Sequence, residues 1–402
     1  MGSNKVKLCL ISKYPPIEGG ESSKAYWLAK GLGERNHEIH IITNAWEVES
    51  KYREKFEVND LEQLRPKNVF LHSTDPFIEP SFIPYTKPFT EKIASLAIEI
   101  IREYSLQLID SWYILPYAIS GYIAKTITGK PQILRHAGSD ITRLFKSPYL
   151  NTLFIELFKR VDKIITYPSR KSFFENLGIP EDKIFLNKIS VDTNTFNPNA
   201  DAFDLTKYTD KDINLPIITY IGKVGVTKGI FELTQALSDI KEEFILLLVC
   251  GGEINNQILK RDIENKRLEN KTIILNFVPP WRVPSIMKIS TCIVIPERDF
   301  PVLSHTPILP REAMSTGKCT LLSKELYNKR SYKDLEDGVH AVVINPKNVD
   351  DFRNKLIKVI KNPSYAQEIG KNARKLAEKY EDFDSYLNIT EKLYNDLLAF
   401  SS

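Results

Sequence analysis

The chain has 402 residues, of which 42% are hydrophobic and 26% are charged, and its net charge at neutral pH is +4. This composition excludes a largely disordered chain, and the length favours two domains over one. The excess of basic residues is too small to indicate a nucleic-acid-binding protein, so we expect no nucleic-acid partner.

Nothing in the sequence indicates secretion or a membrane span. The apolar run at residues 6–11 is too short for a signal peptide and is typical of a first strand. No stretch is long and apolar enough to cross a bilayer. Four widely separated cysteines lie in apolar runs, which favours buried free thiols over disulfides or a metal site: Cys9, Cys250, Cys292 and Cys319. We expect a cytoplasmic protein, and a peripheral contact with the inner membrane surface stays open.

The first half of the chain alternates between short apolar runs and segments with apolar residues at helical spacing. The expected strands are 6–12, 38–43, 68–72, 106–110, 132–135 and 163–166. The expected helices are 21–33, 91–104, 116–128, 150–160 and 169–177. Such alternation predicts a parallel sheet with helices on both faces.

The second half repeats this pattern after a polar segment, residues 191–216, which we interpret as an inter-domain linker. The expected strands are 217–221, 244–250, 273–277, 292–295, 319–322 and 340–344. The expected helices are 230–240, 283–290, 311–315, 349–361, 365–380 and 384–400. We therefore predict an N-terminal domain, 1–200, and a C-terminal domain, 214–380, with the last helix, 384–402, packed back on the first domain.

Two glycine-containing loops each follow an expected strand and precede an expected helix. Residues 15–20 end in Gly19 and Gly20, and residues 222–229 begin with Gly222. Backbone N–H groups and a helix N-terminus in such a loop favour an anion, and ligands of parallel sheets bind beyond the carboxyl ends of the strands. Two such loops suit a diphosphate held between two domains. The alternative for the first loop is a simple turn capped by Ser22 or Ser23.

The second loop also carries Lys223 and Lys228. Cations placed in advance beside a diphosphate stabilise the negative charge that develops when its bond to a sugar breaks. The alternative is a pair of solvated surface lysines.

Further candidates lie beyond two other expected strands. His136 follows the strand at 132–135 and could bind a sugar hydroxyl, whereas Asp140 could bind a sugar or cap the next helix. Glu312 opens a short helix, where its carboxylate could accept hydrogen bonds from both ribose hydroxyls or favour the helix dipole. The acidic pair Asp382 and Asp384 is interpreted as helix capping, and we expect no metal site.

In combination, these motifs resemble the retaining glycosyltransferases of family 4. The likeness covers nearly the whole chain: the opening strand, glycine loop and first helix, the segment 191–196 before the hinge, the loop in which Lys223 stands where Arg is usual, and the helix with Glu312 and Gly317. The resemblance implies an α/β chain with the GT-B fold, two Rossmann-like doubly wound parallel-sheet domains facing a cleft.

The resemblance also implies a reaction. A sugar would move from a nucleotide-diphosphate sugar to a saccharide or lipid-linked acceptor, with retention at the anomeric carbon and without a metal or another cofactor. The leaving phosphate would take the acceptor proton. Lys223, Lys228 and His136 would be catalytic, with His136 contacting the donor sugar. The donor would contact Gly19, Gly20, Gly222, Phe277, Val278, Ser304, Thr306, Ile308, Leu309 and Glu312.

One position departs from the family pattern. A glutamate is usual eight residues before Glu312, and here that residue is Ser304; Glu297 or Asp299 could compensate. A nucleotide-sugar-binding protein with weak catalysis, or a sugar-nucleotide epimerase, therefore stays an alternative. The loops at 46–57 and 75–88 would form the acceptor side, with aromatic residues that suit stacking or loop packing: Phe77, Phe82 and Tyr85. The helix at 150–160 is expected to be core, with a membrane contact as the alternative.

Overall fold

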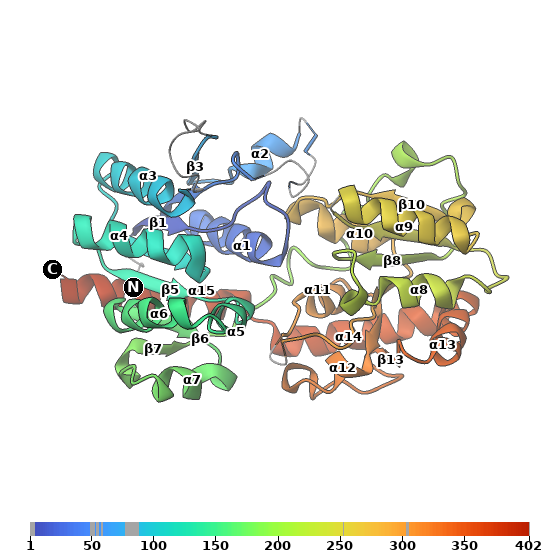
Figure 1. The fold of residues 1–402 in the computed structure, drawn as a ribbon. Coiled ribbons are helices and arrows are strands. Elements are labelled where there is room, and N and C mark those ends of the chain that lie inside the picture. The colour runs from blue at the N-terminus through green and yellow to red at the C-terminus, as the bar shows by residue number, and fades with distance from the viewer. Residues whose placement is uncertain are drawn as a thin grey trace, which may run out of the picture. The chain divides into compact units, whose positions relative to one another are not determined.

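The computed structural model describes residues 5–48, 53, 56–57, 59–76, 88–251, 253–302 and 305–401 (Figure 1). The chain divides into two compact units, Met1–Ile189 with Asp384–Ser402, and Ser190–Phe383. The boundary lies before residue 200, where the first predicted domain ends.

The first unit is a parallel sheet of seven strands in the order β3-β2-β1-β4-β5-β6-β7. The strands are β1 (Lys7–Ile11), β2 (Glu38–Thr43), β3 (Val69–Ser73), β4 (Leu108–Trp112), β5 (Gln132–Arg135), β6 (Lys163–Thr166) and β7 (Ile184–Leu186). The helices are α1 (Gly20–Glu34), α2 (Asp60–Leu64), α3 (Phe89–Glu103), α4 (Ile119–Thr128), α5 (Ser139–Leu144), α6 (Pro148–Arg160), α7 (Lys171–Asn176) and α15 (Phe383–Ser401). The strand order reverses between β1 and β4, which is the switch point of this sheet.

The second unit is a parallel sheet of six strands in the order β10-β9-β8-β11-β12-β13. The strands are β8 (Ile217–Ile221), β9 (Ile245–Val249), β10 (Thr272–Leu275), β11 (Cys292–Ile295), β12 (Cys319–Ser323) and β13 (Val342–Ile344). The helices are α8 (Ile230–Leu237), α9 (Glu253–Asn265), α10 (Val283–Ile289), α11 (Leu309–Ser315), α12 (Lys324–Tyr327), α13 (Val349–Lys361) and α14 (Pro363–Tyr380). Its switch point lies between β8 and β11.

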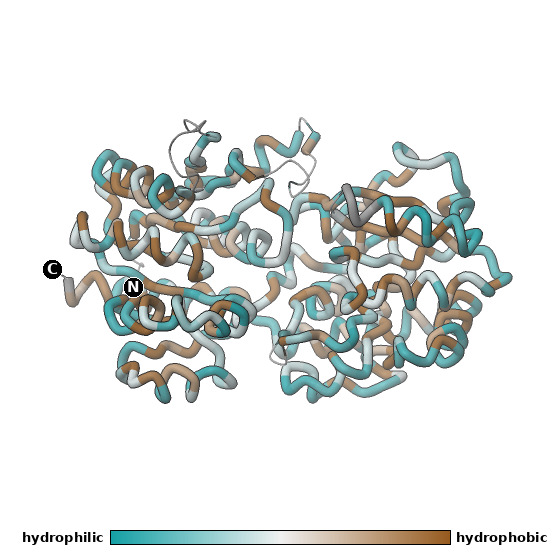
Figure 2. Tube along the Cα trace, in the orientation of Figure 1, coloured by the Kyte–Doolittle hydropathy of each residue, from teal (hydrophilic) through white to brown (hydrophobic). Residues whose placement is uncertain are grey.

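The strands are apolar on both faces because helices cover both faces of each sheet. In Figure 2, hydrophobic residues gather along the strands of each unit, whereas the helices alternate between hydrophobic and hydrophilic residues. The α6 helix follows this rule: it buries Phe154, Leu157 and Phe158 in the core and exposes Tyr149 and Leu153. All four cysteines are buried free thiols, as expected. Among the described residues, no helix combines the length and the apolar character that crossing a membrane requires.

The segment predicted as a linker belongs to the second unit instead. Leu205 is buried in that unit's core, and the N–H of Phe203 donates to the carbonyl of Ser285 over 3.2 Å. Val191 and Phe196 are buried as well. A few well-spaced apolar residues therefore anchor a segment whose overall composition is polar.

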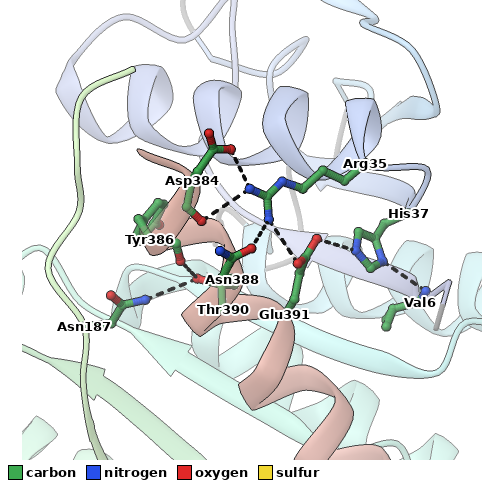
Figure 3. A network of polar contacts seen from close by, with 9 residues as sticks. All are labelled: Val6, Arg35, His37, Asn187, Asp384, Tyr386, Asn388, Thr390 and Glu391. Carbon is green, nitrogen blue, oxygen red and sulfur yellow. Dashed lines mark hydrogen bonds and ion pairs between the residues drawn. The ribbon is translucent and has the colours of Figure 1, made fainter. Parts of the chain in front are cut away.

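The C-terminal helix α15 is fixed to the first unit by a polar network (Figure 3). The Arg35 guanidinium donates to Asp384 over 2.6 Å and to Glu391 over 3.0 Å. His37 Nε2 lies 2.9 Å from the second Glu391 oxygen, and His37 Nδ1 accepts the N–H of Val6. The predicted packing of the last helix thus rests on specific pairs. Asp384 serves as a partner of Arg35, a role that its place beside Asp382 did not predict.

Candidate functional site

The clearest candidate site lies at the switch point of the second unit. β8 leads into residues 222–229, and its neighbour β11 leads into residues 296–308. Because parallel strands end at the same edge of a sheet, both loops start side by side. The sequence pointed to candidates in both loops, and the structure shows that the two loops begin at neighbouring strands.

Buried groups fix the start of the first loop. The Tyr220 hydroxyl donates to the Lys223 carbonyl over 2.8 Å, and the N–H of Gly222 donates to the Val249 carbonyl over 3.0 Å. A Cβ on Gly222 would lie 2.9 Å from the Tyr220 hydroxyl oxygen, so a side chain there would disturb this arrangement. Gly222 is therefore required by close packing.

The end of this loop is fixed by Gly229, which has a φ of +71° and precedes α8. A Cβ here would lie 1.8 Å from the carbonyl oxygen of Pro296, the residue that follows β11. The N–H of Arg298 also donates to the Thr227 carbonyl over 3.0 Å. The two loops are thus joined through their backbones, and this contact places Lys228.

Lys228 forms an ion pair with Glu297 across the two loops. Its ammonium also lies 4.5 Å from the centre of the Phe300 ring, a cation–π distance. Burial favours a higher pKa for Glu297, but His305 and the Lys228 charge outweigh it and the pKa is lowered. Glu297 is therefore ionised at neutral pH. Lys223, by contrast, is exposed on the same loop.

Glu312 lies in the first turn of α11 and is buried, and its N–H donates to the Ile308 carbonyl over 3.1 Å. Ile308 is the N-cap residue and Leu309 the first helical residue. The Tyr332 hydroxyl donates to the Pro307 carbonyl, which fixes the approach to this helix.

Of the other residues predicted in the second unit, Thr306 is exposed before α11, and Ser304 lies outside the described residues. Phe277 and Val278 follow β10, where Val278 packs against the core around Leu275. Their part in donor binding stays a prediction.

The glycine loop of the first unit ends in a backbone that only glycine adopts easily. Gly19 has a φ of +117° and is the N-cap of α1, which begins at Gly20. The predicted capping by Ser22 or Ser23 is wrong, because Ser22 is buried inside the helix. Among the described residues, no heavy atom lies within 4 Å of a Cβ built on Gly19 or Gly20.

His136 follows β5 in the first unit and is buried. Its Nε2 lies 2.7 Å from the Thr166 hydroxyl, and its Nδ1 has no hydrogen-bond partner within the described part of the chain. Burial, assisted by the charges of Arg170 and Lys24, lowers the pKa of His136 to about 3. At neutral pH it is therefore an uncharged hydrogen-bonding group.

Asp140 binds nearby backbone N–H groups. Its carboxylate accepts hydrogen bonds from the N–H groups of Ala137, Ile141 and Ile114 over 3.2, 2.8 and 3.3 Å. Burial raises the pKa of Asp140 to about 6, although these hydrogen bonds oppose the shift. The N-cap residue of α5 is Gly138 and Asp140 lies inside the helix, so Asp140 binds backbone groups of the turn without being the N-cap, and its contact with a sugar stays a prediction.

The described residues contain no group of three or more His, Cys, Asp or Glu side chains placed to hold a metal ion. The cations near the switch point are side chains. Arg298 is one of them, and it pairs with Glu232 and with Asp299.

Comparison with known proteins agrees with this picture. Residues 204–376 match the family model described as "Glycosyl transferases group 1". The match lies within the second unit, which is therefore similar to this family. An uncharacterized glycosyltransferase of Methanocaldococcus jannaschii is 22% identical over 98% of this chain and 99% of its own. The N-acetyl-alpha-D-glucosaminyl L-malate synthase of Bacillus anthracis is 26% identical over 66% of each chain. The expectation that the chain is a glycosyltransferase is confirmed.

A solved structure confirms the fold class. HepE of Anabaena in complex with UDP-glucose is similar with a TM-score of 0.68 and 16% identity, over 97% of this chain and all of the other. The fold is therefore GT-B, with two Rossmann-like domains. Assignment to family 4 and a shared cleft between the sheets stay predictions.

Sequence reasoning missed His305 and the pairing of Glu297 with Lys228. His305 follows directly on Ser304, the position that departs from the family pattern. That departure was the available signal, because a changed residue in a binding loop suggests that neighbouring side chains have changed their roles.

Proposed function

We propose that the protein transfers a sugar from a nucleotide-diphosphate sugar to a saccharide or lipid-linked acceptor, with retention of configuration at the anomeric carbon. The second unit binds the donor and the first unit binds the acceptor. The observation that carries this proposal is Lys228, held by Gly229 at the switch point of a group 1 glycosyltransferase domain.

In this reaction the bond between the anomeric carbon and the diphosphate oxygen breaks, and its electron pair goes to the diphosphate. Lys228, with Lys223, stabilises that charge, while Glu312 accepts hydrogen bonds from the ribose hydroxyls. The acceptor oxygen bonds to the anomeric carbon on the same face, and its proton passes to the leaving phosphate. His136, uncharged and buried, contributes only hydrogen bonds.

Lys228 and Lys223 supply the positive charge in the proposed mechanism, so we propose that transfer needs no metal and no further cofactor. We expect product formation to continue in excess EDTA.

We also propose that the protein works in the cytoplasm, and that the exposed side chains of Tyr149 (92% exposed) and Leu153 (46% exposed) on α6 contact a membrane surface. Sedimentation with anionic vesicles, compared with a Tyr149→Ser variant, tests that contact.

The decisive experiment is product formation with Lys228→Ala. We expect transfer to fall by about 10²–10³-fold, the usual effect of removing one group that stabilises charge in a transition state. The matched control is Lys361→Ala, which removes an exposed lysine paired with Glu242 and should leave transfer unchanged. Unchanged transfer in Lys228→Ala would contradict the proposal.

Ser304 motivates a second candidate, a nucleotide-sugar-binding protein with little or no transfer activity, or an epimerase. Calorimetry with nucleotide sugars beside a product assay separates them. Binding without a glycosidic product favours the binding protein, and conversion of the donor without any acceptor favours the epimerase.

A further inference from the structure

A buried carboxylate forms an ion pair with the lysine that we propose to bind the diphosphate. Glu297 is 5% exposed, and one of its oxygens pairs with Lys228. The other, Oε2, lies 3.2 Å from His305 Nε2. Neither atom has a hydrogen-bond partner among the described residues. The two are close enough to form an ion pair but have not formed a full hydrogen bond.

The His305 ring is held in place by stacking. The ring centroid lies 4.0 Å from that of Phe300, with the planes 22° apart, and the backbone N–H of His305 donates to the Val302 carbonyl over 2.9 Å. Phe300 in turn lies under the Lys228 ammonium. Lys228, Glu297, Phe300 and His305 therefore form one packed cluster, which we call the lysine cluster.

Binding of a diphosphate beside Lys228 would disturb the charge balance of this cluster. In the structure, Glu297 and Lys228 neutralise each other. A diphosphate shares the Lys228 ammonium and brings negative charge toward a carboxylate that is buried. A buried charge is costly unless it is paired, so Glu297 then needs a second positive partner. Histidine is the side chain whose charge changes most readily between pH 5 and 8.

The charged groups next to the lysine cluster already form ion pairs with other residues. Arg298 pairs with Glu232 and Asp299, and Asp299 also pairs with Lys347 over 2.7 Å. None of these is the side chain that faces the open oxygen of Glu297, which is His305.

Two tyrosines also lie within the electrostatic influence of Glu297. Burial raises the pKa of Tyr220 and of Tyr332, with a smaller contribution from the Glu297 charge, so both stay neutral. The Arg311 charge lowers the pKa of Tyr332 and the Glu381 charge raises it, and these two groups pair with each other. Glu312 raises the pKa of Tyr332 as well and is a further carboxylate near this site. The negative charge of Glu312 would further favour a protonated His305.

We propose that Glu297 positions the Lys228 ammonium, and that the pair Glu297–His305 takes up one proton from solvent when the diphosphate of a nucleotide sugar binds. The proton goes to His305 Nε2 and completes an ion pair with Glu297 Oε2, so that Lys228 can turn toward the diphosphate. This inference rests on the proposed function of the same site. By linkage, the affinity for the donor falls as pH rises, by as much as ~10-fold per pH unit.

The test is calorimetric titration of the full-length protein with UDP-glucose, ADP-glucose and GDP-mannose in two buffers of different ionisation enthalpy. Sugar nucleotides are used because their diphosphate diester has no group that titrates near neutral pH. We expect uptake of about 0.5–1 proton per bound ligand at pH 7.5. His305→Gln should bind with uptake close to zero and with an affinity that hardly depends on pH. The matched control is His340→Gln, because His340 lies outside the cluster and bonds the N–H of Glu336.

Glu297→Gln gives an independent reading, since it keeps an oxygen for Lys228 but removes the charge that attracts the proton. It should also bind without proton uptake. Binding by the unchanged protein without uptake would overturn the inference, and so would uptake in the two variants as large as in the unchanged protein. If none of the three nucleotide sugars binds, the proposed function itself fails, and the missing binding signal distinguishes that result from binding without protons.

Discussion

Replacing Gly229 by alanine tests whether the contact between the two loops places Lys228. At this residue the φ is +71°, and the added Cβ would lie 1.8 Å from the backbone oxygen of Pro296. The neighbouring atom belongs to the backbone, so it cannot move aside as a flexible side chain would. We expect Gly229→Ala to shift the start of α8 away from β11.

The loss in free energy of unfolding caused by Gly229→Ala has two contributions. A residue with a Cβ in the left-handed region costs about 1–2 kcal/mol. Relieving an overpacked contact costs about 1–3 kcal/mol more. Together they amount to about 2–5 kcal/mol, a large share of the ~5–15 kcal/mol that stabilises a typical folded protein. Because Lys228 precedes this residue, donor binding should weaken as well.

The control is Gly338→Ala in the same unit. Gly338 has a φ of +74°, but within the described part of the chain no heavy atom lies within 4 Å of its Cβ position. This variant therefore loses only the free energy of an unfavourable backbone conformation. Hydrogen exchange of β8 and α8 amides measures stability in the second unit, because a chain of two units need not unfold in one step. Equal loss of protection in the two variants would refute the argument from Pro296.

Three further predictions concern the first unit. Asp110→Asn should destabilise it by about 3–5 kcal/mol in urea unfolding, because Arg135, 2.9 Å away and buried, would lose its counter-charge; Asp384→Asn, an exposed partner of Arg35, should cost less than about 1 kcal/mol. His136 has a lowered pKa of about 3, so the folded state binds fewer protons than the unfolded state between that value and ~6.5. Stability should therefore fall by about 3 kcal/mol from pH 6.5 to pH 4, and His136→Asn should remove that fall; an unchanged profile would contradict it. The pH dependence that Asp140 contributes has the opposite sign, because its pKa is raised to about 6 and the folded state binds the proton more tightly. Stability should therefore fall as pH rises from 4 to 6. Asp140→Asn should flatten this slope in the same titration.

The alternation of strands and helices could be predicted from the sequence. The sequence placed β2, β5, β6, β8 and β11 with their observed limits, because buried parallel strands are short apolar runs bounded by polar turns. It missed β7, and it missed α9, whose residues are largely polar and give little helical apolar spacing. It also located the loop at 222–229, since glycine and lysine between a strand and a helix form a local pattern.

The contacts of these residues depend on segments that are distant in the sequence, so they could not be predicted from local patterns. Gly229 is required because Pro296, far away in the chain, approaches its Cα. Lys228 meets Glu297, which also contacts His305, because β8 and β11 are neighbours in the sheet, although many residues separate them in the sequence. A local pattern shows which side chains are available near a strand end. The order of the strands decides which of them share a site.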